Sequence, residues 1–312
     1  MVDDLVRRVL AGERRALART ISLVEDASPE GRDALAKLYP HTGRAHVVGV
    51  TGGGGSGKST LTCALALQWR RRGRTVGIVA IDPTSPFTHG ALLGDRIRMQ
   101  ELTRDPGVFL RSMATRGALG GLAAATADVV AVLDAFGKEI VIVETVGAGQ
   151  DEVEIADTAH TAIVISVPGA GDDIQAIKAG ILEIADILVV NKADLPGADL
   201  IARQLHIFLT LNKNEGWQIP IIKTVAAKDE GVVELADGIE AHRTYLEESG
   251  RMEAARRHRA RRQLLSLAQA RLLDRVLAAA GANDTIDELV EAIARREVDP
   301  HTAAERLIQA AG

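Results

Sequence analysis

The stretch Val47–Thr60, VVGVTGGGGSGKST, decides the fold of this chain. A β-branched apolar run leads into the pattern Gly52-x4-Gly57-Lys58-Ser59, and a helical pattern follows at once. Strand, glycine loop and helix in this order point several backbone N–H groups at one anion, and the missing side chains let a polyphosphate approach closely. The stretch therefore predicts a phosphate-binding loop formed by Gly53, Gly54, Gly55, Ser56, Gly57, Lys58, Ser59 and Thr60.

Two side chains of this loop carry the expected chemistry. Lys58 supplies a positive charge that can reach the β- and γ-phosphates, and the Ser59 hydroxyl is placed to ligate Mg²⁺. A flexible glycine-rich turn is the alternative interpretation. The Lys-Ser pair and the strand-to-helix context favour the phosphate loop, because a simple turn requires neither.

Composition indicates an ordinary globular protein. Of the 312 residues, 46% are hydrophobic and 25% charged, and the net charge of −5 provides no basic field for nucleic acid or an anionic membrane. Aromatic residues are only 3%, which argues against a base-stacking surface. We find no signal-peptide core and no apolar run of membrane-spanning length, and we expect a cytoplasmic protein.

Hydrophobic periodicity predicts an α/β fold. Helices are expected from residue 2 to about 38 and over 121–135, and strands over 47–51, 75–81, 108–113, 139–145, 161–167, 187–191 and 219–225. Strands that alternate with helices indicate a doubly wound, mostly parallel sheet. A long helix over 246–277 and two shorter helices over 285–311 should follow. The predicted division is an N-terminal helical segment (1–43), a P-loop domain (44–232) and a helical C-terminal arm (233–312).

The segment Asn191-Lys192-Ala193-Asp194, at the end of a predicted strand, points to guanine. The Asp194 carboxylate can accept hydrogen bonds from N1–H and from the 2-amino group, a donor pair that adenine lacks. Lys192 would lay its alkyl stem on the base, and Asn191 would reach N7. Ala226 and Ala227 follow the last strand, where the Ala227 N–H can contact guanine O6. A helix N-cap at Asn191 is the plainer alternative.

Acidic residues follow three predicted strands. Glu144 ends a fully apolar run, where it would face Mg²⁺, and the N–H of Gly147 would contact the γ-phosphate. Two further groups are either turn residues or switch loops: Asp82 with Asp95, and Asp172 and Asp173 with Lys178. No histidine pair has ligand spacing and Cys63 is the only cysteine, so a transition-metal site is not expected.

Together the motifs resemble one family. The segments GGGGSGKST, AIDPTSPFTHGALLGDRIRM, ETVGAGQDEVEIAD, VPGAGDDIQAIKAGI and NKADL are similar to those of MeaB-type (ArgK-like) P-loop GTPases, the chaperones of methylmalonyl-CoA mutase and related adenosylcobalamin-dependent acyl-CoA mutases. The resemblance covers essentially the whole chain. It implies GTP and GDP binding with Mg²⁺, slow hydrolysis stimulated by the partner, and a homodimer formed through the C-terminal arm. Adenosylcobalamin would belong to the partner mutase. The GTPase would gate the loading of this cofactor into the mutase and would protect the mutase from inactivation.

The resemblance also assigns residues to roles. It implies a metal environment of Ser59, Asp82, Asp95 and Glu144, and catalytic or switch roles for Lys58, Asp82, Asp95, Glu144, Gly147, Asp172 and Lys178. It implies a guanine site of Asn191, Lys192, Asp194, Ala226 and Ala227. The chain departs from the family pattern at Gly54, where proline is common, and at His89, where glycine is common.

Three other functions compete with this one. A GTPase chaperone for a nickel enzyme would need a Cys/His cluster that the sequence lacks, and a partitioning ATPase would need a lysine at position 53. A GTP-dependent binding module with negligible hydrolysis stays open, because only Gln150 could position the water after Gly147. The run of arginines between Arg251 and Arg262 is compatible with RNA binding. Neighbouring glutamates favour a solvated or interface helix face.

Overall fold

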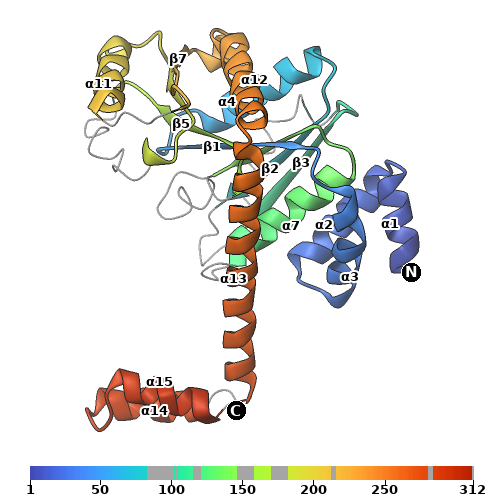
Figure 1. Cartoon of the computed structure of the whole chain (residues 1–312), viewed down its shortest axis with the longest axis vertical. Coiled ribbons are helices and arrows are strands. Elements are labelled where there is room, and N and C mark those ends of the chain that lie inside the picture. The colour runs from blue at the N-terminus through green and yellow to red at the C-terminus, as the bar shows by residue number, and fades with distance from the viewer. Residues whose placement is uncertain are drawn as a thin grey trace. The chain divides into compact units, whose positions relative to one another are not determined.

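The computed structural model describes residues 1–82, 102, 104–114, 121–145, 158–169, 182–211, 216–279 and 284–310. Its centre is a seven-stranded sheet with the order β3-β2-β4-β1-β5-β6-β7, in which every pairing is parallel (Figure 1). The strands are β1 (His46–Gly52), β2 (Val76–Asp82), β3 (Val108–Ala114), β4 (Ile140–Glu144), β5 (Thr161–Ser166), β6 (Ile187–Asn191) and β7 (Ile221–Thr224). The predicted α/β fold with a parallel sheet is confirmed.

Helices cover both faces of the sheet, because apolar side chains alternate between its two sides. Val47 and Val141 join the core formed with α7 and the N-terminal helices, whereas Val48 and Ile140 join the core formed with α4 and α12. A third core lies between α11 and strands β5 and β6. These helices are α4 (Lys58–Arg71), α7 (Gly121–Ala135), α11 (Ala198–Leu211) and α12 (Val232–Glu248).

The N-terminal segment predicted to be helical forms α1 (Val2–Leu10), α2 (Arg14–Glu25) and α3 (Pro29–Leu38). The Ser28 side chain caps α3 by accepting a hydrogen bond from the N–H of Gly31 at 3.0 Å, and Pro29 occupies the first helical position. Leu17 and Ile21 of α2 are completely buried. The N-terminal helices therefore pack on the sheet domain as expected.

The C-terminal region differs from the prediction in one respect. The helix predicted over 246–277 is present as α13 (Arg251–Ala279), but its first residues, 246–248, belong instead to the end of a separate helix, α12 (Val232–Glu248). The break lies at Ser249 and Gly250, where Gly250 has φ +70°, a left-handed conformation that ends a helix. The apolar face of α12, which includes Leu235 and Ile239, is buried against α4 and the sheet.

The chain divides into two compact units, Met1–Arg257 and His258–Gly312. α12 packs with the sheet, and the predicted division at residue 233 stays a prediction. Unit 2 contains the remainder of α13 with α14 (Asp284–Ala294) and α15 (Pro300–Ala310), which contact each other. Two short helices around Asp299-Pro300 are thus confirmed. None of the helices in the described ranges has the length and apolarity that crossing a membrane requires.

Candidate nucleotide-binding site

The predicted site residues gather at the carboxyl edge of the sheet. All strands are parallel, so the residues that end them, among them Gly52 of β1, Glu144 of β4 and Asn191 of β6, emerge on the same side. β1 lies between β4 and β5, and the loop after it leads directly into α4. In open α/β sheets, ligands bind at this edge, beside the central strands.

Two glycines of the loop are required by the local geometry. Gly52 has φ +146°, and a Cβ atom there would lie 2.5 Å from the carbonyl oxygen of Ile165. Gly57, the N-cap of α4, has φ +86°, and a Cβ atom there would lie 2.6 Å from Nδ2 of Asn191. A side chain at either position would collide with the neighbouring strand ends, so the loop must pass them as bare backbone.

Gly53 and Gly54 are explained differently. Cβ atoms added at these positions would meet no atom of the described residues within 4 Å, so packing does not demand glycine there. Bare backbone facing open space leaves room for a ligand to approach the N–H groups closely. The loop then opens α4, whose N-terminus favours an anion. This geometry fits a polyphosphate.

Lys58 is held over the loop by two backbone carbonyls. Its Nζ donates to the carbonyl oxygens of Gly52 at 2.8 Å and of Gly53 at 2.9 Å, and the side chain is buried. Without a nucleotide these contacts solvate the buried ammonium, because a buried charge needs hydrogen-bonding partners. The charge is therefore already positioned beside the loop that would hold the phosphates.

Ser59 and Glu144 form a buried polar pair beneath the loop. The Ser59 hydroxyl donates to Oε1 of Glu144 at 2.5 Å, and both residues are less than 10% exposed. A second hydroxyl pair lies alongside, where Thr145 Oγ1 is 3.1 Å from Thr51 Oγ1. The predicted magnesium residues Ser59 and Glu144 are thus in contact, although they lie 85 residues apart in the sequence.

Asn191 links the phosphate loop to the last strand of the sheet. Its Nδ2 donates to the carbonyl oxygen of Ser56 at 2.9 Å. Its Oδ1 accepts from the Thr224 hydroxyl at 3.0 Å and from the N–H of Ala226 at 3.2 Å. The side chain is only 2% exposed. One amide hydrogen of Nδ2 is left by these three bonds, so contact with N7 of guanine stays a prediction.

Lys192 has the left-handed backbone conformation, with φ +54°. This conformation is unfavourable for a residue with a side chain and is concentrated at functional sites. It is held by a backbone hydrogen bond from Ala193 to Thr224 at 3.0 Å. The Lys192 ammonium reaches back to the carbonyl oxygen of Gly55 at 2.9 Å, so its stem lies between β6 and the phosphate loop.

Asp194 lies on the surface and is paired. Oδ2 of Asp194 accepts from Nζ of Lys228 at 3.0 Å, and the two side chains are 40% and 56% exposed. The hydrogen bond from Lys228 lowers the pKa of Asp194 and raises that of Lys228. Asp194 is therefore ionised at neutral pH, the state that can accept two hydrogen bonds from guanine. Ala227, the expected O6 contact, is exposed in the same short helix as Lys228 (Ala226–Lys228).

The structure describes only the backbone of one further predicted site residue and nothing of four others. The backbone of Asp82 ends β2, opposite Ala114 of β3. Asp95, Gly147, Asp172 and Lys178 fall outside the described residues, so their predicted roles are not tested. Within the described ranges, no group of three or more His, Cys, Asp or Glu side chains is arranged to hold a metal ion.

The sequence did not predict the roles of two residues of this site. Thr224 holds the amide of Asn191, and Lys228 pairs with Asp194. Both lie near the end of the last strand, within or beside the Ala226-Ala227 segment that was predicted to contact the base. Their position at a strand end was visible, but nothing local indicated which side chains they would contact.

A glycine loop after the central strand, a lysine over that loop and an Asn-Lys-x-Asp segment beside it define a P-loop GTPase. The sequence profile described as methylmalonyl Co-A mutase-associated GTPase MeaB matches residues 17–281. The chain therefore belongs to the MeaB family of GTPases.

Individual relatives agree with this assignment. A protein of Pyrococcus abyssi, described as a candidate GTPase, is 48% identical over 99% of this chain and 96% of its own length. The GTPase ArgK of Escherichia coli is 32% identical over 97% of this chain and 95% of its own. The crystal structure of a LAO/AO transport system kinase is 26% identical with a TM-score of 0.75, and covers 99% of this chain and 96% of that one.

Proposed function

We propose that this GTPase is a GTP-dependent chaperone of an adenosylcobalamin-dependent acyl-CoA mutase of the methylmalonyl-CoA mutase type. The observation that carries the proposal is the family match over residues 17–281, whose description names an association with that mutase. The GTPase would gate the loading of adenosylcobalamin into the mutase and protect it from inactivation. The cofactor itself would belong to the mutase.

The proposed nucleotide contacts follow the geometry of the site. Backbone N–H groups of residues 53–60 would surround the phosphates, and Lys58 would exchange its two carbonyl partners for phosphate oxygens. Asp194 would exchange Lys228 for guanine, while the Ala227 N–H would contact O6. The Asn191 side chain would then link the loop that holds the phosphates to the segment that contacts the base.

We propose Mg²⁺ as the metal of this site, because the residues present fit a hard cation. Ser59 and Glu144 offer oxygen atoms within 2.5 Å of each other in a buried position, and oxygen is the ligand that Mg²⁺ prefers. Asp82 and Asp95 would complete the acidic environment, directly or through water. When bound, the metal ion would neutralise charge on the phosphates.

The proposed coupling to the mutase involves Gly147, Asp172 and Lys178. Gly147 would contact the γ-phosphate, and Asp172 and Lys178 would belong to the loop that the mutase orders. An unassisted P-loop GTPase of this kind is expected to turn over slowly, on the order of 10⁻⁴ to 10⁻² per second. If the mutase changes GTP affinity by some factor, GTP must change mutase affinity by the same factor.

The test is the GTPase rate as a function of mutase concentration for the wild type, Lys178→Ala and the control Lys223→Ala. Lys223 is an exposed residue paired with Asp199. We expect Lys178→Ala to lose most of the stimulated rate and little of the basal rate, and the control to lose neither. An equal proportional loss of both rates would assign Lys178 to the phosphate site. If no mutase isolated with the protein from its native cells stimulates hydrolysis, the chaperone function is wrong.

We also propose that the C-terminal arm forms a homodimer. Exposed leucines of α13 support this, because apolar side chains at helical spacing need a partner surface: Leu264, Leu265, Leu272 and Leu273. The double variant Leu265→Glu with Leu272→Glu should be monomeric by light scattering and still bind GTP. A monomeric wild type at micromolar concentration would contradict the dimer.

A further inference from the structure

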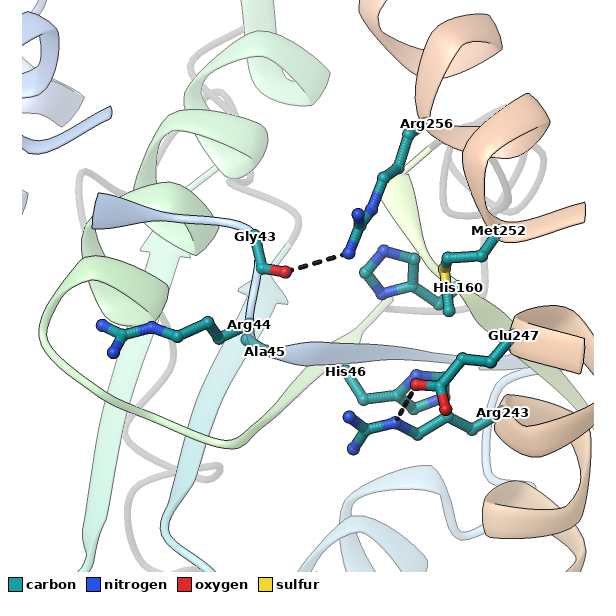
Figure 2. A pocket seen from close by; sticks show the side chains of 9 residues that line it. All are labelled: Gly43, Arg44, Ala45, His46, His160, Arg243, Glu247, Met252 and Arg256. Atoms are coloured by element: carbon teal, nitrogen blue, oxygen red, sulfur yellow. Dashed lines mark hydrogen bonds and ion pairs between the residues drawn. The ribbon is translucent and has the colours of Figure 1, made fainter. Parts of the chain in front are cut away.

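A pocket of about 290 Å³ lies at the opposite, amino edge of the sheet (Figure 2). His46 begins β1 there and His160 directly precedes β5, while Arg243 and Glu247 come from α12 and Arg256 from the first turns of α13. β1 runs from this pocket to the phosphate loop, and its seven residues at about 3.3 Å each separate the two by about 20 Å. The pocket is therefore distinct from the nucleotide site.

Two stacked histidines line the pocket in fixed orientations. The rings of His46 and His160 lie 5.4 Å apart with an interplanar angle of 20°. Nδ1 of His160 accepts a hydrogen bond from the N–H of Val47 at 2.8 Å, so the proton of the neutral ring is on Nε2. Nε2 of His46 lies 2.9 Å from the Thr161 hydroxyl, which lies 2.9 Å from Nδ1 of His242. The histidine wall is thus rigid.

The loop that faces the histidines is equally fixed. The N–H groups of Gly43, Arg44 and Ala45 all donate to the buried carboxylate of Asp134, at 2.5, 3.2 and 3.0 Å. Nη2 of Arg256 donates to the Gly43 carbonyl oxygen at 2.9 Å, which ties α13 to this loop. A pocket whose walls are held by hydrogen bonds needs little rearrangement to receive a ligand.

The charged side chains in the lining are the guanidinium groups of Arg243 and Arg256 and the carboxylate of Glu247, so the balance is positive. Arg243 donates through Nε to Glu247 at 2.9 Å, which leaves its two Nη groups to other acceptors. Arg256 contacts a neutral carbonyl through one nitrogen, so that bond does not cancel its charge. Arg44 contributes mainly backbone, since its guanidinium extends away from the other side chains (Figure 2). The result is a cationic hollow in a chain of net charge −5.

We propose that this pocket binds the phosphate group of a small phosphorylated metabolite, at a site separate from that for GTP. Guanidinium groups from two helices, those of Arg243 and Arg256, offer donors from different directions, and a phosphate monoester has three acceptor oxygens to receive them. The volume exceeds that of phosphate alone, so part of an organic body would enter with it. Carboxylates share some of this chemistry but present only two oxygens in one plane.

The test uses the full-length protein with its nucleotide site filled by a non-hydrolysable GTP analogue, so that the probe cannot bind the phosphate loop. Phenyl phosphate, inorganic phosphate and benzoate are titrated by calorimetry into the wild type, Arg243→Gln, Arg256→Gln and the control Arg257→Gln. Arg257 is adjacent on α13 but pairs with Glu253 and does not line the pocket.

We expect saturable binding of phenyl phosphate that is weakened about tenfold or more by Arg243→Gln and by Arg256→Gln and is unchanged by Arg257→Gln. Benzoate should bind more weakly, and the His160 imidazole signals should shift in NMR spectra on addition of phenyl phosphate. Circular dichroism checks that each variant is folded. Binding that does not saturate, or that all three variants weaken equally, would overturn the proposal, and tighter binding of benzoate would reassign the pocket to carboxylates.

Discussion

The two ends of the proposed nucleotide site, the phosphate end and the guanine end, differ in how far their polar side chains are buried. At the phosphate end the polar groups are buried, since Lys58, Ser59 and Glu144 are each less than 10% exposed. At the guanine end, the side chains of Asp194 and Lys228 are 40% and 56% exposed. Buried polar groups must be hydrogen-bonded even without a ligand. An exposed ion pair contributes little free energy, because water solvates each charge almost as well as its partner does. The phosphate end is therefore preorganised, and the guanine end exchanges partners easily.

One buried side chain connects these ends. Asn191 bonds the phosphate loop through Ser56 and the guanine end through Thr224 and Ala226. Variants at the phosphate end should therefore change affinity for every nucleotide, those at the guanine end should change the choice of base, and those at Asn191 should change the stability of the site itself.

The largest effect is expected for Lys58→Met. Loss of two charge-assisted hydrogen bonds to phosphate should weaken GTP and GDP by about 3 to 6 kcal/mol, on the order of 10² to 10⁴ in affinity. Guanine and xanthine nucleotides should lose affinity equally, because Lys58 does not contact the base. Titration with a fluorescent GDP analogue measures the loss, and Lys223→Met is the control. A smaller loss than that of Asp194→Asn would reverse the ranking of the two ends.

The next largest effect is expected for Asp194→Asn. An amide at this position leaves the guanine donors poorly paired, so GTP should bind about 30- to 1000-fold more weakly. Xanthosine triphosphate should gain affinity, because its 2-oxo group accepts a hydrogen bond from the new amide. Competition between GDP and xanthosine diphosphate measures the change. Unchanged GTP affinity would remove Asp194 from the base site.

A moderate loss of stability is expected for Asn191→Ala. The substitution leaves the Ser56 carbonyl, the Thr224 hydroxyl and the Ala226 N–H without this partner in a buried position, at a cost of about 1 to 3 kcal/mol in the free energy of unfolding. Thr224→Val removes only one of the three bonds and should cost less. Urea unfolding of both variants without nucleotide tests this order; equal stability of Asn191→Ala and wild type would show that the link is not stabilising.

The smallest effect is expected for Lys228→Met. Guanine no longer has to displace Lys228 from Asp194, so GDP affinity should rise by about two- to fivefold at low salt. The gain should shrink in about 0.5 M salt, because screening weakens the exposed ion pair. Measuring GDP affinity at both salt concentrations tests it. A loss of affinity would instead show that Lys228 contributes to the nucleotide-bound state.

Local patterns predicted most elements of the fold, and the helix Gly121–Ala135 and the strand Ile187–Asn191 agree with the predicted bounds. The prediction failed at Ser249 and Gly250, where helical periodicity continues on both sides of the break. A single glycine costs a helix only about 1 kcal/mol, so the pattern alone did not indicate an end there. Burial of α12 against α4 and the sheet decided it.

The sequence by itself determined the phosphate loop and the Asn-Lys-Ala-Asp segment, because each is a run of consecutive residues whose chemistry does not depend on the rest of the chain. Only the tertiary structure decided which residues meet. Ser59 contacts Glu144 across 85 residues, and Asn191 contacts Ser56 across 135. Such contacts depend on strand order and register, which arise when many apolar faces are buried together. For the same reason the cationic pocket around His160 and Arg256 has no counterpart in any local pattern of the sequence.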